Sequence, residues 1–318
     1  MTSTASKNLS TVRAPALRPG DRVRIISPAG PVIEDILDDG LRLLRDWGLE
    51  VVVGDDVYRR RPPYDYLAGG DNHRLQGLVD AWSDPDCRAI ICSRGGYGTM
   101  RILEELPIER LVAEPRLFVG FSDITALHLY LAGCGGLATV HGPVIKSLGN
   151  HGHDSESVAR LHNALFADSD APRPWTGMTT LRPGTARGPV FGGNLSLIVP
   201  MLSSPFRPSV DGAIVIVEDI GEEDYRIDRL LTALRLADDA DIGGLVIGDF
   251  TDCDGVFVDA DEFDDFLADL TADFDCPVVA GAPVGHGDPN FAFPVGVLAT
   301  LDADCGELRF HRHAAAPR

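Results

Sequence analysis

The stretch Arg116-Leu-Phe-Val-Gly-Phe-Ser122-Asp-Ile-Thr-Ala-Leu-His-Leu-Tyr-Leu131 joins a short apolar run to a segment of helical periodicity. The first part predicts a buried strand, and residues 124–131 predict a helix. Ser122 therefore stands on a strand-to-helix turn, where the first free N–H groups of the helix point at whatever its hydroxyl contacts. This is the arrangement of a nucleophile elbow, although Ile124 replaces the last glycine of Gly-x-Ser-x-Gly. The alternative is that Ser122 or Asp123 only caps the helix.

The first half of the chain repeats this alternation of strand and helix on both sides of Ser122. Apolar runs mark the strands, and amphipathic periodicity marks the helices. The alternation predicts an α/β fold with a mostly parallel sheet covered by helices on both faces. Besides the Ser122 unit, the expected strands are 22–26, 50–53, 88–92 and 139–143, and the expected helices are 33–47, 73–82 and 155–166.

A second α/β domain is expected after residues 168–188, where Pro, Gly, Thr and Arg accumulate and periodicity lapses. The predicted division is a flexible N-terminus 1–16, an N-terminal domain 17–167, a linker 168–188 and a smaller C-terminal domain 189–318. The active site is expected in the cleft between the two domains. In the C-terminal domain the expected strands are 213–217, 245–249, 277–280, 297–301 and 307–310, and the expected helices follow Gly192-Gly-Asn-Leu195 and span 225–236 and 259–275.

Composition narrows the class of protein. The chain has 318 residues, a formal net charge of -20 and 44% hydrophobic residues. So acidic a chain argues against nucleic acid as a partner, because phosphate backbones need a basic surface. No signal peptide or membrane-spanning apolar run is evident, so a cytoplasmic location without a membrane partner is expected. The six cysteines form no Cys-x-x-Cys pair, and neither a metal site nor a cofactor is expected.

Two segments far from Ser122 supply a carboxylate and an imidazole. Glu218 follows four apolar residues and so ends a strand, where open sheets carry their sites. The alternative is a salt bridge with Arg226 or Arg229. His286 lies in a glycine-spaced loop after another expected strand, which suits a side chain presented to a cleft. A hydroxyl, a carboxylate and an imidazole are the parts of a serine hydrolase.

The segment Ser93-Arg94-Gly95-Gly96-Tyr97-Gly98 forms a glycine-rich turn after an expected strand. It lacks the Lys-Ser/Thr that follows the last glycine of a phosphate-binding P-loop. We therefore interpret it as one wall of an oxyanion hole, in which an N–H group of Gly95 or Gly96 pairs with that of Asp123.

The chain resembles the LD-carboxypeptidases of peptidase family S66, the murein tetrapeptide carboxypeptidases, whose relatives include the microcin C self-immunity peptidases. The resemblance implies that Ser122 is the nucleophile, that His286 is general base and then general acid, and that Glu218 orients His286. It also implies a cytoplasmic homodimer that needs no metal and removes the terminal D-Ala that follows an L-centre of diaminopimelate or lysine in murein tetrapeptides during peptidoglycan recycling. The motifs that carry it are 17–21, 27–30, 67–71, 94–98, 120–123, 192–195, 218–222, 225–229 and 285–287.

A carboxypeptidase must bind a terminal carboxylate, and Arg94, with Tyr97 beside it, is the candidate. The alternative for Arg94 is an ion pair at the sheet edge. Two other functions remain open. An immunity-type peptidase would use the same three residues on an aminoacyl or peptidyl sulfamoyl adenylate, with Trp175 as a stacking partner for adenine. A non-catalytic α/β protein would bind a small anion at the glycine-rich turn.

Overall fold

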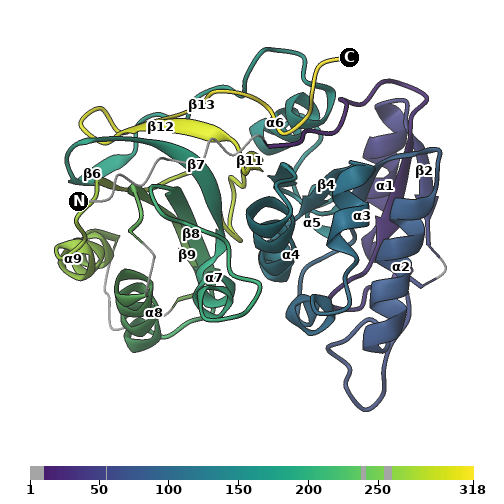
Figure 1. Ribbon diagram of the computed structural model, residues 1–318, viewed down its shortest axis with the longest axis horizontal. Coiled ribbons are helices and arrows are strands. Elements are labelled where there is room, and N and C mark those ends of the chain that lie inside the picture. The colour runs from purple at the N-terminus through teal and green to yellow at the C-terminus, as the bar shows by residue number, and fades with distance from the viewer. Residues whose placement is uncertain (1–10, 55, 238–240, 254–259) are drawn as a thin grey trace.

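The computed structural model describes residues 11–54, 56–237, 241–253 and 260–318, and it contains two sheets flanked by helices (Figure 1). The first sheet has the strand order β2-β1-β3-β4-β5-β11, and its neighbours are parallel except for β5 and β11. Its strands are β1 Arg22–Ile26, β2 Glu50–Val53, β3 Cys87–Cys92, β4 Leu117–Gly120, β5 Thr139–His141 and β11 Phe293–Val295.

Alternate residues of these strands pack on opposite faces of the first sheet, as the pleat requires. Ile25 and Ile91 share a buried cluster with helices α1 (Asp38–Asp46), α5 (Ile145–Leu148) and α6 (Glu156–Phe166). Ile90 and Phe118 share another with helices α2 (Asp71–Ser83), α3 (Ile108–Ala113) and α4 (Thr125–Leu129). The sheet is therefore covered on both faces, as predicted.

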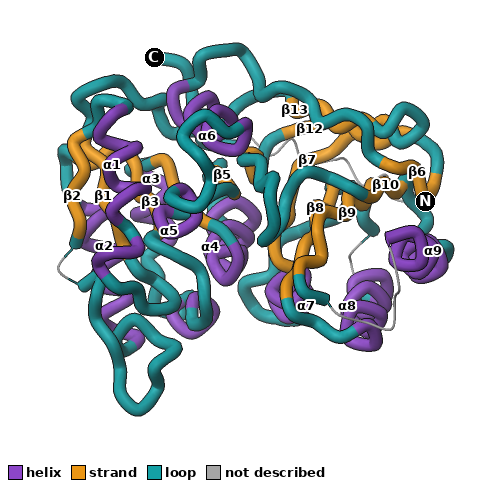
Figure 2. Tube along the Cα trace, turned by 180° about the vertical axis from the view of Figure 1, so that it is seen from behind, coloured by secondary structure: helices purple, strands orange, loops and turns teal. Residues whose placement is uncertain are grey.

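The second sheet has the order β13-β12-β7-β8-β9-β10-β6, in which β7, β8, β9 and β10 are mutually parallel. Its helices lie along one side in Figure 1, and Figure 2 shows the strands of the two sheets as separate groups. The predicted fold class is confirmed. The elements are β6 Thr179–Arg182, β7 Thr185–Asn194, β8 Ile214–Ile220, β9 Gly244–Thr251, β10 Val278–Ala280, β12 Leu298–Asp302, β13 Glu307–Phe310, α7 Leu195–Leu202, α8 Asp224–Leu236 and α9 Ala260–Thr271.

The end of the chain returns to the first sheet. Strand β11 pairs antiparallel with β5, and Pro15 bridges to Ala316. Of the N-terminus expected to be flexible, residues 1–10 lie outside the described residues, whereas Val12 bridges to Leu137. The two halves of the chain are thus joined by strand pairing as well as by the connection near residue 170.

Part of the segment expected to be a linker, residues 168–188, is strand. It contains β6 and the first residues of β7. The edge strand β6 exposes both Thr179 and Thr180, so it carries no alternation of apolar and polar residues that the sequence could reveal. Strand β7 extends to Asn194, and helix α7 follows directly at Leu195, where an apolar helix was expected.

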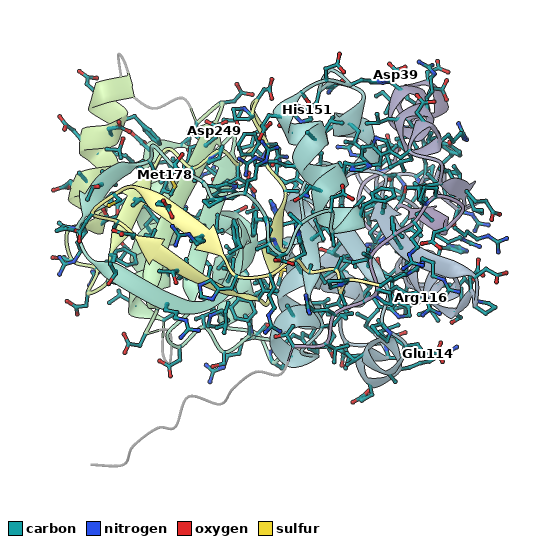
Figure 3. The ribbon with its side chains drawn as sticks, turned by 90° about the horizontal axis from the view of Figure 1, so that it is seen from above. Asp39, Glu114, Arg116, His151, Met178 and Asp249 are labelled. Carbon is teal, nitrogen blue, oxygen red and sulfur yellow. The ribbon has the colours of Figure 1, made fainter. Side chains whose placement is uncertain are left out.

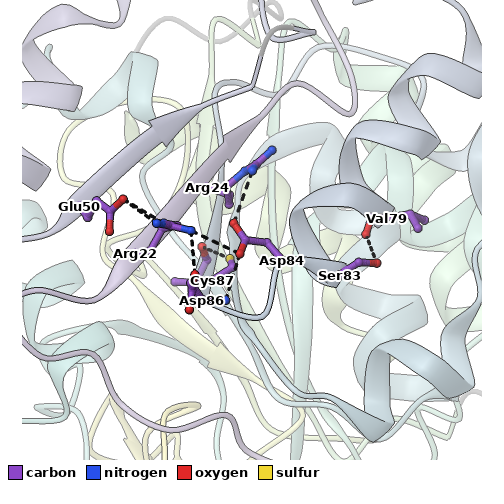
Figure 4. A network of polar contacts seen from close by, with 9 residues as sticks. Arg22, Arg24, Glu50, Val79, Ser83, Asp84, Asp86 and Cys87 are labelled. Carbon is purple, nitrogen blue, oxygen red and sulfur yellow. Dashed lines mark hydrogen bonds and ion pairs between the residues drawn. The ribbon is translucent and has the colours of Figure 1, made fainter.

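Ion pairs gather at the amino-terminal edge of the first sheet. Arg22 contacts Glu50, Asp84 and Asp86, and Arg24 reaches Asp84 (Figure 4). Ion pairs of this kind contribute little to stability, because solvent screens the two charges. The candidate site lies at the opposite, carboxyl-terminal edge of this sheet. Among the described residues, no helix has the length and apolar character needed to cross a membrane.

Candidate active site

The strand order of the first sheet reverses between β1 and β3. Open α/β sheets bind ligands at such a switch point, outside the carboxyl ends of the strands. The loops after β1 and β3 meet there: the Ser27 and Ser93 hydroxyls lie 2.6 Å apart, and the Gly30 N–H donates to the Gly95 carbonyl at 3.0 Å. Ser122 follows the next strand, β4, at the same edge.

Ser122 adopts the left-handed backbone conformation with φ of 63°. Such a conformation costs a residue with a side chain about 1–3 kcal/mol, so the surrounding structure must impose it. Phe121, not Ser122 or Asp123, occupies the N-cap position of the following 3₁₀ turn, so the capping interpretation is wrong. The buried Asp123 carboxylate instead accepts the Thr99 N–H at 2.9 Å. The Ser122 side chain is left for another contact.

That contact is with His286. Its Nε2 lies 3.0 Å from Ser122 Oγ, and its Nδ1 lies 2.7 Å from Glu218 Oε2. Because a carboxylate only accepts, Nδ1 carries the proton and Nε2 is free to accept the Ser122 hydroxyl hydrogen. The imidazole packs against the Phe121 ring with centroids 4.5 Å apart. Three residues from distant segments therefore form one hydrogen-bonded series.

Glu218 lies in β8 and is fully buried. Burial raises the pKa of its carboxyl group, and the hydrogen bond from His286 opposes that shift. The expected alternative, a salt bridge with Arg226, is wrong, because Arg226 pairs with Glu222 and Glu223. Arg229 lies over the Tyr225 ring at 5.5 Å. The ion-pair partner of Glu218 among the described residues is therefore His286, not Arg226.

Contacts between helix α4 and strand β7 of the second sheet fix the position of Ser122 relative to Glu218. Gly193, with φ of 133°, lies against Thr125 of α4, and a Cβ there would come within 2.2 Å of Thr125 Oγ1. The same hydroxyl accepts the Asn194 N–H at 3.0 Å, and the Asn194 amide donates to Asp219 at 2.8 Å. These bonds connect the helix that begins after Ser122 to the residue that follows Glu218.

Gly95 and Gly96 lie directly against the nucleophile turn. A Cβ on Gly95 would come within 2.7 Å of Ser122 Cβ and 3.0 Å of the Phe121 carbonyl oxygen. Gly96 has φ of 118°, and a Cβ there would come within 2.9 Å of Gly30 Cα. Only glycine allows the backbone to approach Ser122 this closely.

A buried arginine, which we did not single out from the sequence, supports the glycine-rich turn. The Arg74 guanidinium on α2 donates to the carbonyls of Pro28 and Gly98, each at 2.7 Å, and pairs with Asp71. Arg101 also pairs with Asp71 at 2.7 Å, and these two arginines hold the pKa of Asp71 at about 2. The signal in the sequence was a charged residue on the buried face of an amphipathic helix.

Replacing Arg74 by methionine is expected to lower the free energy of unfolding by about 3–5 kcal/mol, since it leaves two buried carbonyls without donors and removes one partner of Asp71. Urea unfolding followed by circular dichroism measures the change. The matched control is Arg101→Met, because Arg101 is more exposed and Asp71 keeps its buried partner. Equal losses in the two variants would show that burial of Arg74 adds nothing.

Arg94 has no carboxylate within ion-pair distance in the described part of the chain, so its interpretation as a sheet-edge ion pair is wrong. Its guanidinium donates to the Pro31 carbonyl at 3.1 Å, and partial burial lowers its pKa. Lys146, which the sequence analysis did not single out, is a second cation nearby: burial and then Arg94 lower its pKa. Tyr97 is exposed and contacts the Tyr66 ring at 5.6 Å.

Trp175 lies differently from expectation. It is buried against Phe293 and Phe310, so it offers no face to an adenine. His151 is also buried, and it lies 3.3 Å from Asp288 in the loop that carries His286. Among the described residues, no group of three His, Cys, Asp or Glu side chains is arranged to hold a metal ion.

Comparison with known proteins gives consistent matches over nearly the whole chain. The family model of the LD-carboxypeptidase N-terminal domain matches residues 23–142, and that of the C-terminal domain matches residues 187–301. A putative carboxypeptidase of Streptomyces coelicolor is 40% identical over 306 residues, which cover 95% of this chain and 97% of the relative. The murein tetrapeptide carboxypeptidase of Pseudomonas aeruginosa is 34% identical over 297 residues, which cover 89% and 94%.

Two solved structures of related proteins have folds similar to that of this chain. The muramoyltetrapeptide carboxypeptidase of Oxalobacter formigenes has a TM-score of 0.79 at 29% identity, over 91% of this chain and 97% of that one. The microcin C7 self-immunity protein has a TM-score of 0.84 at 22% identity, over 96% and 100%, a likeness of fold alone.

Proposed function

Because this chain belongs to the LD-carboxypeptidase family, peptidase family S66, we propose that it hydrolyses the amide before the terminal D-Ala of murein tetrapeptides with Ser122, His286 and Glu218. The observation that carries the proposal is the hydrogen-bonded series from Ser122 Oγ through the His286 imidazole to Glu218. That series supplies a nucleophile, a base and a group that orients the base.

In the proposed reaction His286 Nε2 takes the proton of the Ser122 hydroxyl as Oγ attacks the carbonyl carbon of the L-centre. The C–N bond then breaks, His286 protonates the departing amine of D-Ala, and water activated by the same imidazole hydrolyses the ester on Ser122. Glu218 keeps the Nδ1 proton in place and stabilises the imidazolium ion. These three side chains and water supply every group that the proposed reaction uses.

The oxyanion of the tetrahedral intermediate is proposed to accept hydrogen bonds from the N–H group of Gly95 or Gly96 and from that of Asp123. The close approach of Gly95 to Ser122 and the position of Asp123 at the start of the 3₁₀ turn support this assignment. Each good donor in such a hole lowers the barrier by roughly 3–4 kcal/mol.

The terminal carboxylate of the substrate is proposed to bind Arg94, with Tyr97 on the same loop. Arg94 makes one hydrogen bond to a backbone carbonyl, and no carboxylate of the described residues neutralises it. Lys146 adds positive charge on the same side. A substrate carboxylate would therefore meet a cation that the fold has left without an anionic partner.

We also propose the division into domains 17–167 and 189–318, which the composition of residues 168–188 indicates, and, from the family resemblance, a cytoplasmic location and a homodimer. The two family matches, 23–142 and 187–301, support the division in two. Light scattering of the purified protein tests the dimer: a mass near twice the 34.1 kDa of the chain agrees, and a mass near 34.1 kDa contradicts it.

The direct test incubates the protein with a murein tetrapeptide that ends in L-lysine or L-diaminopimelate followed by D-Ala. Mass spectrometry is expected to show the loss of one alanine. An intact tetrapeptide would contradict the proposed substrate. The same three residues would then be tested on an aminoacyl sulfamoyl adenylate.

Replacing Gly95 by alanine is expected to lower kcat/KM for the tetrapeptide by at least about 100-fold, since the new methyl group must displace Ser122, and a shift of about 1 Å in a reacting group costs a factor of that size. The matched control is Gly152→Ala, where a Cβ meets nothing within 4 Å. Retention of full activity by Gly95→Ala would show that this close contact is not needed.

A further inference from the structure

Asp249 lies near the carboxyl end of a parallel strand beside the proposed catalytic residues. It lies in β9, whose neighbour β8 carries Glu218, and its N–H donates to the Val284 carbonyl at 2.8 Å. Its side chain is exposed, although the residues on either side of it are buried. In Figure 3 Asp249 is labelled over the half of the molecule that holds the second sheet, and His151, labelled over the other half, lies 3.3 Å from Asp288 in the loop that carries His286.

The two glycines that flank His286 pack on this aspartate. A Cβ on Gly285 would come within 2.6 Å of Asp249 Cβ, and a Cβ on Gly287 would come within 2.6 Å of Asp249 Oδ2. The His286 turn therefore lies across the Asp249 side chain. This contact places a carboxylate beside the turn that carries the imidazole, on the side of the second sheet.

The Asp249 carboxylate is exposed beside the proposed catalytic residues, and no cation of the described residues neutralises it. Its Oδ2 accepts the Thr251 hydroxyl, and within the described ranges no Lys, Arg or His lies within ion-pair distance of it. Asp219 accepts hydrogen bonds from Asn194, Ser196 and the Ile220 N–H. Glu222 pairs with Arg226 and Glu218 with His286, whereas Asp249 is exposed and has no cation among the described residues, so it is open to an external cation.

We infer that Asp249 binds the primary ammonium group on the side chain of the residue whose carbonyl Ser122 attacks. This inference rests on the proposed function, in which that residue is a diamino acid. The departing residue brings a carboxylate, which Asp249 repels and Arg94 attracts. Opposite charges on the two sides of Ser122 thus orient the substrate so that its scissile amide faces the hydroxyl.

The test compares four tetrapeptides ending in D-Ala. The residue before D-Ala is L-lysine, Nε-acetyl-lysine or norleucine, and the fourth peptide has L-lysine with an acetylated N-terminus. Each is incubated with wild type, Asp249→Asn and the matched control Asp252→Asn, and kcat and KM are measured. Asp252 is exposed at the same strand end and has φ of 51°, which asparagine tolerates.

For both lysine peptides, Asp249→Asn is expected to raise KM by about 10- to 100-fold with kcat nearly unchanged, the size of one lost charge-assisted hydrogen bond. On the acetyl-lysine and norleucine peptides, wild type and Asp249→Asn are expected to be equally poor, and Asp252→Asn to behave as wild type throughout. This pattern assigns the side-chain ammonium to Asp249.

Three results would overturn the inference. An equal loss on all four peptides would mean that Asp249 only shapes the His286 loop. No loss on any peptide would mean that substrate does not reach it. A loss confined to peptides with a free N-terminus would assign Asp249 to that other ammonium group. Failure of wild type to cleave any of the four would instead remove the proposed function, and the inference with it.

Discussion

Ser122→Ala is expected to abolish tetrapeptide hydrolysis, lowering kcat by roughly a million-fold, as loss of the nucleophile does in serine hydrolases. The hydroxyl 3.0 Å from His286 Nε2 is the atom that forms the ester, and alanine has no atom to replace it. Alanine keeps the Cβ at φ of 63°, so the backbone strain and the fold should be unchanged. Single-turnover assays with mass-spectrometric detection measure the rate.

The control for this variant is Ser203→Ala, which removes an exposed hydroxyl bonded only to the Pro200 carbonyl in the described structure and should leave the rate unchanged. The experiment also separates the two classes of function. A protein that only binds a small anion at the glycine-rich turn would keep its function in Ser122→Ala. Residual hydrolysis within tenfold of wild type would exclude Ser122 as the nucleophile.

Glu218→Gln is expected to lower kcat by roughly 10³- to 10⁴-fold, the effect of removing the orienting carboxylate from a Ser-His-acid arrangement. The glutamine amide can donate to His286 Nδ1, which moves the imidazole proton to Nε2 and leaves no acceptor for the Ser122 hydroxyl. The geometry of the site would otherwise be kept, since the two side chains have the same shape.

The stability of Glu218→Gln, unlike its activity, is not expected to fall. Because burial raises the pKa of Glu218, the folded chain binds this proton more tightly than the unfolded chain does. The contribution of Glu218 to stability is therefore present below the pKa that this carboxyl group has in the unfolded chain, and it is lost as the pH rises above that pKa. A neutral glutamine does not carry this penalty. At neutral pH the free energy of unfolding is expected to be no lower than in wild type, as urea titration measures. A loss of stability together with full activity would contradict both expectations.

The sequence predicted the parts of the site that end regular elements. Ser122, Glu218 and His286 each follow an apolar run, and such runs mark strands, here β4 of the first sheet and β8 and β10 of the second. The structure brings the three together by hydrogen bonds. Their roles in catalysis stay predictions until the variants are measured.

What escaped prediction depends on contacts between distant segments. Strand β11 is three residues long and contains Pro294, so no local pattern marks it. Arg74 is charged yet buried, because the carbonyls of Pro28 and Gly98 and the Asp71 carboxylate together satisfy it. Asp249 was recognised only as the end of a strand. Its position matters because Gly285 and Gly287 fold over it.

The sharing of the site between two sheets bears on how the chain is made. A ribosome delivers Ser122 164 residues ahead of His286, and the first sheet waits still longer for its edge strand β11. Under the proposed mechanism, a nascent or prematurely terminated chain holds a serine with no base to activate it. By this mechanism, hydrolytic capacity appears only once synthesis has passed His286, so a shorter product lacks the base that the reaction needs.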